Sequence, residues 1–208
     1  PFKTIYLISG YIPETGDEDD GKLVEANVYL PKTLSTLFPA SRIIYCSSVS
    51  VYQNYTSGRL ISIDDEPKPK TKYALSKLWG ELIIQNHPSY AIVRISSMYG
   101  IGMKQNTFIP SILKDLIVNQ RIHLYGDGSR MQNYIHVSDV ARILIKAAAL
   151  ALHTTLFAVD KQSYSNKAIA ALLLSELPGE LVFSGEDATP SYCYDNAFTV
   201  HTLGQLEF

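Results

Sequence analysis

The chain has 208 residues, of which 46% are apolar and 18% charged, with a formal net charge of -2. This balance is typical of a globular protein with one sizeable core, and it excludes an intrinsically disordered chain. Basic residues form a run only at KPKTK, so we expect neither a nucleic-acid partner nor an anionic membrane surface. No apolar stretch reaches the roughly 18 residues of a membrane span, so none is predicted.

The cysteines and histidines show no metal or redox spacing. Cys46 and Cys193 lack the C-x-x-C arrangement, and no charged-then-apolar leader opens the sequence. We therefore expect a cytoplasmic protein with two reduced thiols. The histidines form no spaced ligand set, so no metal site is predicted.

The first half of the chain alternates strand and helix patterns. Short β-branched runs predict strands over 3–9, 42–48 and 91–96. The segments between them are long enough for helices, and in residues 71–86 leucine and isoleucine recur at helical spacing. This alternation predicts an α/β fold with a parallel sheet and right-handed crossovers. The acidic residues 14–21 are expected to form a solvated loop that leads into the first helix.

After Tyr99 the pattern changes to glycine-punctuated loops and shorter elements. A strand is expected at TLFAVD. Ser165 has the side chain of an N-cap for a further helix. Helices are also predicted near 110–119 and from about 138 to 151.

Serines stand where ligands bind in a parallel α/β sheet, at the carboxyl ends of the strands. These positions are Ser9, Ser48 and Ser96. Tyr73 and Lys77 follow one helical turn apart, so the ammonium can lie near the phenol and lower its pKa. Ser48 can point into the same crevice and orient a substrate oxygen. The spacing alone also fits an unremarkable surface pair, because such pairs occur by chance.

Four segments in order carry a family resemblance: RIIYCSSVSVY, DDEPKPKTKYALSK, VRISSMYGIG and YGDGSRMQNYIHVSDVARIL. They resemble the extended short-chain dehydrogenase/reductase family, in its NAD-dependent nucleotide-sugar epimerase/dehydratase branch. The resemblance implies a partial Rossmann-like parallel sheet, holding only the later strands, with a small α+β substrate lobe. It implies that residues 1–98 belong to the dinucleotide-binding domain and 99–208 mainly to the substrate lobe, with about 138–160 returning to the sheet.

The resemblance also implies residue roles. Ser48, Tyr73 and Lys77 would be the catalytic set, and the cofactor would be NAD or NADP. The implied cofactor-binding residues are Ser9, Asn27, Ser47, Tyr73, Lys77 and Ile95. The implied substrate-binding residues are Ser48, Ser97, Tyr99, Phe108, Arg130 and Gln132.

The implied reaction is epimerisation, or a related reduction, of a nucleotide-sugar. A 4,6-dehydratase fits less well, because SVS stands where those enzymes have T-D-E. Gln132 stands where the family has a phosphate-contacting arginine, and Arg130 is the expected substitute. The helices carrying Asn27 and Tyr73 imply a homodimer.

The sequence departs from the family at its start. The resemblance implies a glycine-rich, phosphate-binding turn, and no G-x-x-G-x-x-G precedes residues 3–9. A fragment, an omitted segment and a naturally short chain all fit this. The first strand would then have an unpaired edge that favours aggregation or pairing. The alternative function is therefore a truncated or non-catalytic family member that acts as a binding or dimerisation module.

Overall fold

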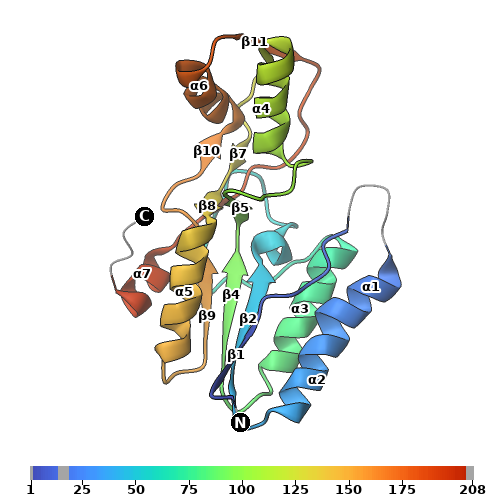
Figure 1. Ribbon diagram of the computed structural model, residues 1–208, viewed down its shortest axis with the longest axis vertical. Coiled ribbons are helices and arrows are strands. Elements are labelled where there is room, and N and C mark those ends of the chain that lie inside the picture. Colours follow the sequence, from blue (N-terminus) through green and yellow to red (C-terminus); the bar gives the residue numbers. More distant parts are fainter. Residues whose placement is uncertain (1, 14–18, 205–208) are drawn as a thin grey trace.

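A four-stranded parallel sheet in the order β1-β2-β4-β9 forms the centre of the protein. The computed structural model describes residues 2–13 and 19–204. Figure 1 shows this sheet below a smaller lobe. The strands are β1 (Thr4–Leu7), β2 (Arg42–Ser48), β4 (Tyr90–Ile95) and β9 (Thr154–Ala158). The predicted α/β class and the strands predicted at 3–9, 42–48 and 91–96 are confirmed.

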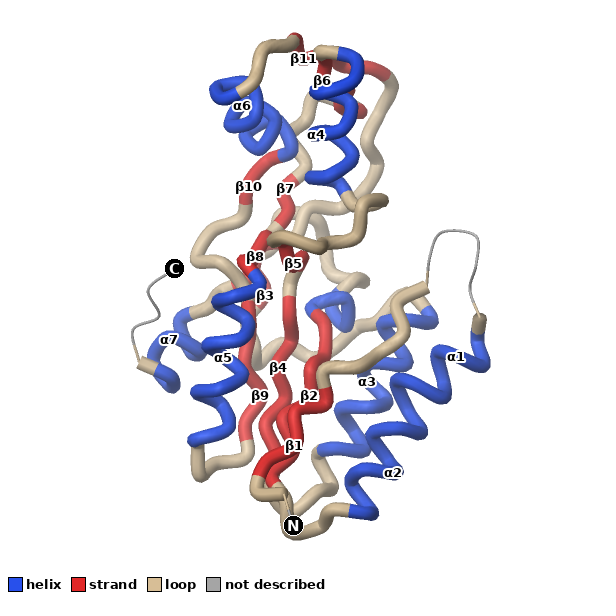
Figure 2. The backbone as a smooth tube through the Cα atoms, in the orientation of Figure 1, coloured by secondary structure: helices blue, strands red, loops and turns tan. Residues whose placement is uncertain are grey.

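Two helical segments cover one face of the sheet, side by side (Figure 2). The first runs without a break through a π-helical turn, and the second is α3. Their bounds are α1 (Asp20–Val24), the π-turn Glu25–Tyr29, α2 (Leu30–Leu37) and α3 (Lys72–Ile84). Asp19 caps α1 by accepting a hydrogen bond from the Lys22 N–H. Of the predicted acidic loop, residues 14–18 lie outside the described residues.

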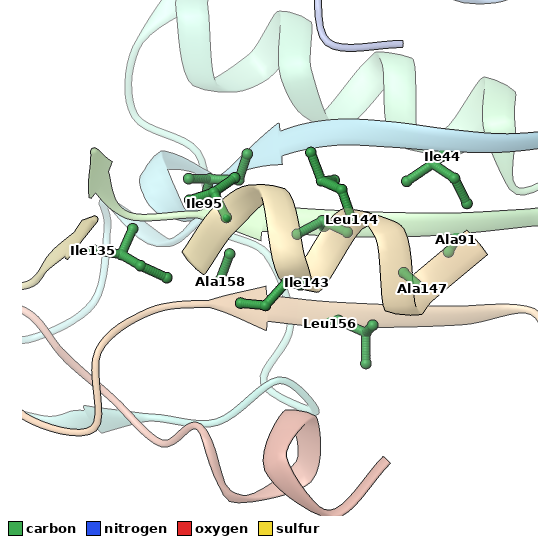
Figure 3. Close-up of a cluster of buried hydrophobic side chains, with 11 residues drawn as sticks. Ile44, Ala91, Ile95, Ile135, Ile143, Leu144, Ala147, Leu156 and Ala158 are labelled. Atoms are coloured by element: carbon green, nitrogen blue, oxygen red, sulfur yellow. The ribbon is translucent and has the colours of Figure 1, made fainter. Parts of the chain in front are cut away.

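Helices α5 (Val137–Ala149) and α7 (Ala197–Leu203) pack beside the strands away from α3. α5 begins one residue before the predicted position and ends two residues earlier. Figure 3 shows its side chains Ile143, Leu144 and Ala147 in a buried cluster with residues of β2, β4 and β9. The Thr199 hydroxyl of α7 accepts a hydrogen bond from the Phe157 N–H, so the end of the chain also returns to the sheet.

The smaller lobe has its own core between two helices and a parallel strand pair. Its elements are α4 (Phe108–Asn119), β6 (Arg121–Tyr125), α6 (Asn166–Glu176) and β11 (Glu180–Ser184). Ser165 caps α6 as predicted, since its hydroxyl accepts from the Ala168 N–H at 3.0 Å.

Three short strand pairs link the lobe to the sheet and brace the loops between them. A 3-10 turn at Val49–Tyr52 follows β2. The short strands are β3 (Leu60–Ile61), β5 (Ser97–Tyr99), β7 (Met131–Gln132), β8 (Tyr134–His136), β10 (Tyr164–Ser165) and β12 (Cys193–Tyr194).

β1 is an edge strand, because within residues 2–13 and 19–204 it pairs with β2 alone. Tyr6 of this strand is exposed. Cys46 and Cys193 are both free thiols. Every helix in the described part of the chain is too short or too polar to span a bilayer.

Candidate active site

A cleft of about 810 Å³ opens at the carboxyl ends of the sheet strands, where the lobe begins. Every residue predicted to be catalytic, cofactor-binding or substrate-binding lines it, except Ser9. β1 ends at Leu7, and side chains beyond it alternate in direction, so Ile8 and Gly10 face the cleft while Ser9 is exposed elsewhere. The role expected for Ser9 in cofactor binding stays a prediction.

Ser48 and Tyr73 bring their hydroxyls together in the cleft. Ser48 is the last residue of β2, and its oxygen accepts a hydrogen bond from the Ser50 N–H at 3.1 Å, which starts the 3-10 turn. Tyr73 lies in the first turn of α3, where the Thr71 cap fixes the start of the helix. Burial raises the pKa of Tyr73, and its hydrogen bond with Ser48 acts against that rise. The two hydroxyl groups therefore lie close enough to hydrogen-bond to each other and to one further oxygen atom.

Lys77 is buried one turn further along α3, with 4% of its surface exposed. Its Nζ lies 4.4 Å from the centroid of the Tyr45 ring, which is a cation–π distance. Burial lowers the pKa of Lys77 to about 8. The sequence predicted that Lys77 would lower the pKa of Tyr73, but burial outweighs this and the opposing partner is Ser48. Tyr45, which the sequence reading missed, holds the ammonium instead.

A buried ion pair lies directly behind these residues and was not predicted. Glu81, fully buried one turn after Lys77, accepts hydrogen bonds from Arg94 Nε at 3.0 Å and Nη2 at 2.7 Å. It also accepts one from the Ser47 hydroxyl, while Arg94 Nη1 contacts the Tyr52 hydroxyl. Helix α3 is thereby fixed to β2 and β4. The i, i+4 spacing of Tyr73, Lys77 and Glu81 places the carboxylate on the same helix face, but it does not identify Arg94 as the partner.

Asn27 links the two helices on this face. It lies in the π-turn, fully buried, and its amide donates to Ser76 Oγ at 3.0 Å and to the Tyr11 carbonyl at 2.9 Å. Ser76 Oγ in turn donates to the Tyr73 carbonyl at 2.8 Å. Single π-turns inside helices are frequent at functional sites. Asn27 therefore positions the backbone of Tyr73 and has few polar atoms left for a ligand.

The helices approach closely because of one glycine. A Cβ at Gly80 would lie 2.3 Å from the Tyr45 hydroxyl and 2.6 Å from the Asn27 carbonyl oxygen. Real Cβ atoms do not come that close, so only glycine allows α3 to reach the π-turn. The position of Lys77 over Tyr45 depends on this contact.

The substrate-side residues lie across the cleft. Ser97, Tyr99 and Phe108 come from β5 and the start of α4. Gln132 donates from its amide to the Asn166 oxygen at 2.6 Å. Arg130 has no side-chain hydrogen bond to a described residue, but it lies near Asp187: despite the partial burial of Asp187, which raises its pKa, hydrogen bonds from Thr189 and the charge of Arg130 lower that pKa. Within residues 2–13 and 19–204, no group of His, Cys, Asp and Glu side chains could hold a metal ion.

Comparison with known proteins gives one family and several distant relatives. The sequence pattern of the NAD dependent epimerase/dehydratase family matches residues 6–156. The chain is similar to dTDP-glucose 4,6-dehydratase of Streptomyces griseus, with 29% identity over 133 residues, 60% of this chain and 40% of that protein. It is also similar to a dTDP-4-dehydro-6-deoxy-D-allose reductase of a Streptomyces species, with 25% identity over 50% of this chain and 35% of that protein.

Among solved structures, the chain is similar to UDP-glucuronic acid 4-epimerase from Bacillus cereus in complex with NAD. The TM-score is 0.81 at 20% identity, covering 97% of this chain and 68% of that one. At this identity the likeness shows a shared fold. The chain spans about two fifths of the length of the curated relatives it matches.

Proposed function

The chain belongs to the NAD dependent epimerase/dehydratase family, and on this basis we propose that it epimerises, or reduces, a nucleotide-sugar with NAD or NADP. The observation that carries the proposal is the convergence of Ser48, Tyr73 and Lys77 in one cleft. A dehydratase, a reductase and an epimerase all resemble the chain at similar distance. The choice between reactions therefore depends on the side chains of the cleft.

The proposed chemistry is a proton exchange at a sugar oxygen. Tyr73 would give a proton to a carbonyl oxygen or take one from a hydroxyl, and Ser48 would hold the same oxygen. The raised pKa keeps Tyr73 protonated, as proton donation requires. Proton removal requires a positive charge nearby, which Lys77 can supply. A bound nicotinamide would supply or accept the hydride.

The sheet side of the cleft fits a nicotinamide cofactor. At Gly10, a Cβ would lie 2.9 Å from Asn27 Oδ1 and 3.5 Å from Lys77 Nζ. The absence of a side chain at Gly10 therefore leaves space in the cleft beside Asn27 and Lys77. The Lys77 ammonium has a ring contact but no hydrogen bond or ion pair to any described residue. The side chains of Asn27 and Ser47 already form hydrogen bonds with neighbouring protein groups. Lys77 is therefore the residue proposed to bind the ribose hydroxyls.

The cleft favours an epimerase or reductase over a 4,6-dehydratase. Loss of water from a sugar needs an acid near the leaving hydroxyl. Val49 and Ser50 follow Ser48 where the dehydratases carry acidic residues. Among the described residues that line the cleft there is no aspartate or glutamate. An elimination therefore has no carboxylic acid to assist it.

The proposed partner, besides the substrate, is a second copy of this chain. Leu75, Trp79 and Leu82 of α3 are each more than half exposed, and they share one face of the helix. Tyr29 on the neighbouring helical segment is also more than half exposed. A self-complementary helical face of this kind supports a twofold dimer. Trp79→Glu should convert the dimer to a monomer in analytical ultracentrifugation; a monomeric wild type would contradict the proposal.

Titration with NADH and NADPH, followed by nicotinamide fluorescence, tests the proposed function. We expect saturable binding of at least one cofactor, weakened at least tenfold in Lys77→Met. Arg121→Gln, on the exposed surface of the lobe, serves as the matched control and should bind like the wild type. If neither cofactor binds the wild type, the alternative function of a non-catalytic binding module replaces the enzyme.

A further inference from the structure

Lys77 is an almost fully buried amine that makes no hydrogen bond or ion pair with any described residue. Burying an isolated ammonium costs far more free energy than burying a neutral polar group, and such a group normally finds a partner or loses its charge. Glu81, one turn further along α3, is already bound to Arg94 through two hydrogen bonds of 2.7 and 3.0 Å. The charge of Lys77 therefore needs another source of stabilisation.

The face of the Tyr45 ring lies against this ammonium. The Nζ of Lys77 is 4.4 Å from the ring centroid, well inside the range of about 6 Å for a cation–π interaction. The ring is buried and its hydroxyl has no hydrogen-bond partner among the described residues, so the polar end of Tyr45 takes no part in the contact. A ring attracts a cation most strongly when both are removed from water. Lys77 thus has an electrostatic partner that carries no charge.

The other groups around Lys77 bring no negative charge near pH 8. Burial raises the pKa of Cys46, on β2, to about 11, and it also raises the pKa of Tyr73, on α3. The π-turn and the segment after β1 contribute Asn27 and Gly10, which do not titrate. A carboxylate in direct contact would neutralise the ammonium, whereas a ring leaves its full positive charge for a ligand.

We propose that the face of the Tyr45 ring keeps the buried Lys77 ammonium charged, and that this contact sets the highest pH at which the cofactor binds. Tyr45 does not line the cleft, so it is a positioning residue that acts through Lys77. The part of the inference that concerns the cofactor rests on the proposed function. The charge of Lys77, in contrast, is a property of the protein alone and can be measured without a ligand.

The first test measures the pKa of Lys77 in the cofactor-free protein, by NMR of lysine labelled with carbon-13 at Cε and with Lys77→Met to assign the signal. Tyr45→Phe keeps the ring and removes only the unpartnered hydroxyl, so the pKa should stay near the wild-type value of about 8. Tyr45→Leu removes the ring and should lower the pKa by about 1 unit. Substitution of Tyr45 by difluorophenylalanine keeps the shape of the ring but weakens its negative face, and should lower the pKa by less.

The second test measures NADH and NADPH affinity between pH 6 and pH 10. At pH 8 about half of the wild-type Lys77 is charged, and a pKa 1 unit lower leaves about one tenth charged. Tyr45→Leu should therefore bind about fivefold more weakly at pH 8 and like the wild type at pH 6, where both are charged. Tyr90→Leu is the matched control, because Tyr90 packs in the same buried cluster but stacks on His153. It should lower thermal stability and leave both pH curves unchanged.

Each other outcome has a definite meaning. An unchanged pKa of Lys77 in the leucine and difluorophenylalanine variants would overturn the inference, whatever the cofactor does. If Tyr45→Leu does not fold, the difluorophenylalanine variant decides, because it preserves the packing. A lowered pKa with an affinity that falls equally at pH 6 and pH 8 would overturn the link to the cofactor. If the wild type binds neither NADH nor NADPH, the proposed function fails, and the NMR titration alone decides the role of Tyr45.

Discussion

The two sides of the cleft differ in how many of their buried polar groups have hydrogen-bond partners. Next to Ser48, Tyr73 and Lys77, the buried carboxylate of Glu81 accepts hydrogen bonds from Arg94 and from Ser47. Near the end of β4 and in the loop before β7, the Ser96 hydroxyl and the Nε of Arg130 are buried without a hydrogen-bond partner among the described residues. Paired groups hold the backbone in place, whereas a buried donor without a partner costs about 1–3 kcal/mol of folding free energy. The comparison shows that a satisfied polar network fixes the elements that carry Ser48, Tyr73 and Lys77, whereas the polar groups near β7 are less completely paired.

One group on the sheet side departs from this rule. The Tyr45 hydroxyl is buried without a partner, against the backbone at Gly80. Burial raises the pKa of Tyr45 well above its ordinary value, so the hydroxyl stays neutral. Tyr45 contributes through the face of its ring, over which Lys77 lies. Packing therefore positions Lys77, while hydrogen bonds position the residues around it.

The largest expected effect comes from breaking the pre-organised side. Glu81→Gln leaves Arg94 buried without a counter-charge, and losing one partner of such a pair costs about 3–5 kcal/mol. We expect this loss in the free energy of unfolding measured with urea. Arg142→Gln, which removes an exposed ion pair with Asp139, is the control and should cost at most about 1 kcal/mol. Equal losses in the two variants would show that the buried pair is not a structural anchor.

A smaller effect is expected at the close helix contact. Alanine normally stabilises a helix interior relative to glycine by about 1 kcal/mol. At Gly80 we expect the opposite, a loss of about 1–3 kcal/mol, because the new methyl group overlaps the Tyr45 ring and the Asn27 backbone. Thermal unfolding of Gly80→Ala checks the sign. A stabilised variant would mean that the contact between α3 and the π-turn is looser than described.

The smallest effect is a pH dependence caused by Lys77. Its pKa is lowered from 10.5 to about 8 by burial, so between these values the unfolded chain binds more protons than the folded protein. Stability should therefore rise with pH from about 8 to 10, by about 1 kcal/mol per pH unit relative to Lys77→Met. Below pH 8 both states carry the charge and the difference stays constant. Parallel curves for the two proteins would contradict a buried, desolvated ammonium.

The sequence predicted the helices and strands that form the cleft better than it predicted the contacts between their side chains. The end of β2 at Ser48 and the helical spacing of Tyr73 and Lys77 are local properties, so pattern and spacing predicted them. Ile8 and Gly10 line the cleft where Ser9 was expected, because side chains alternate in direction and a shift of one residue exchanges the two faces. Local patterns place each residue on its element, and they do not say which elements meet.

The features of the site that the sequence did not predict are contacts between residues far apart in the chain. Glu81 and Arg94 lie on different elements, and no spacing rule joins a helix carboxylate to an arginine inside an apolar strand. Arg130 was singled out as a substitute for a phosphate contact. Its place beside Ser96 became visible only when the loop before β7 was folded against the end of β4. These contacts depend on tertiary packing, which a single sequence does not display.

The measurement that tests the account most directly is a single-turnover reaction of the protein with NAD or NADP and UDP-glucose, UDP-glucuronate or the dTDP forms of these sugars, followed by nicotinamide absorbance and by chromatography of the sugar. We predict that at least one sugar is converted to a product. Tyr73→Phe should slow that change by about 10²–10⁴-fold and leave cofactor affinity intact, because it removes only the proton-transferring hydroxyl. A Tyr73→Phe rate equal to the wild type, or cofactor binding without conversion of any of these sugars, would contradict the assignment of this cleft as an oxidoreductive active site.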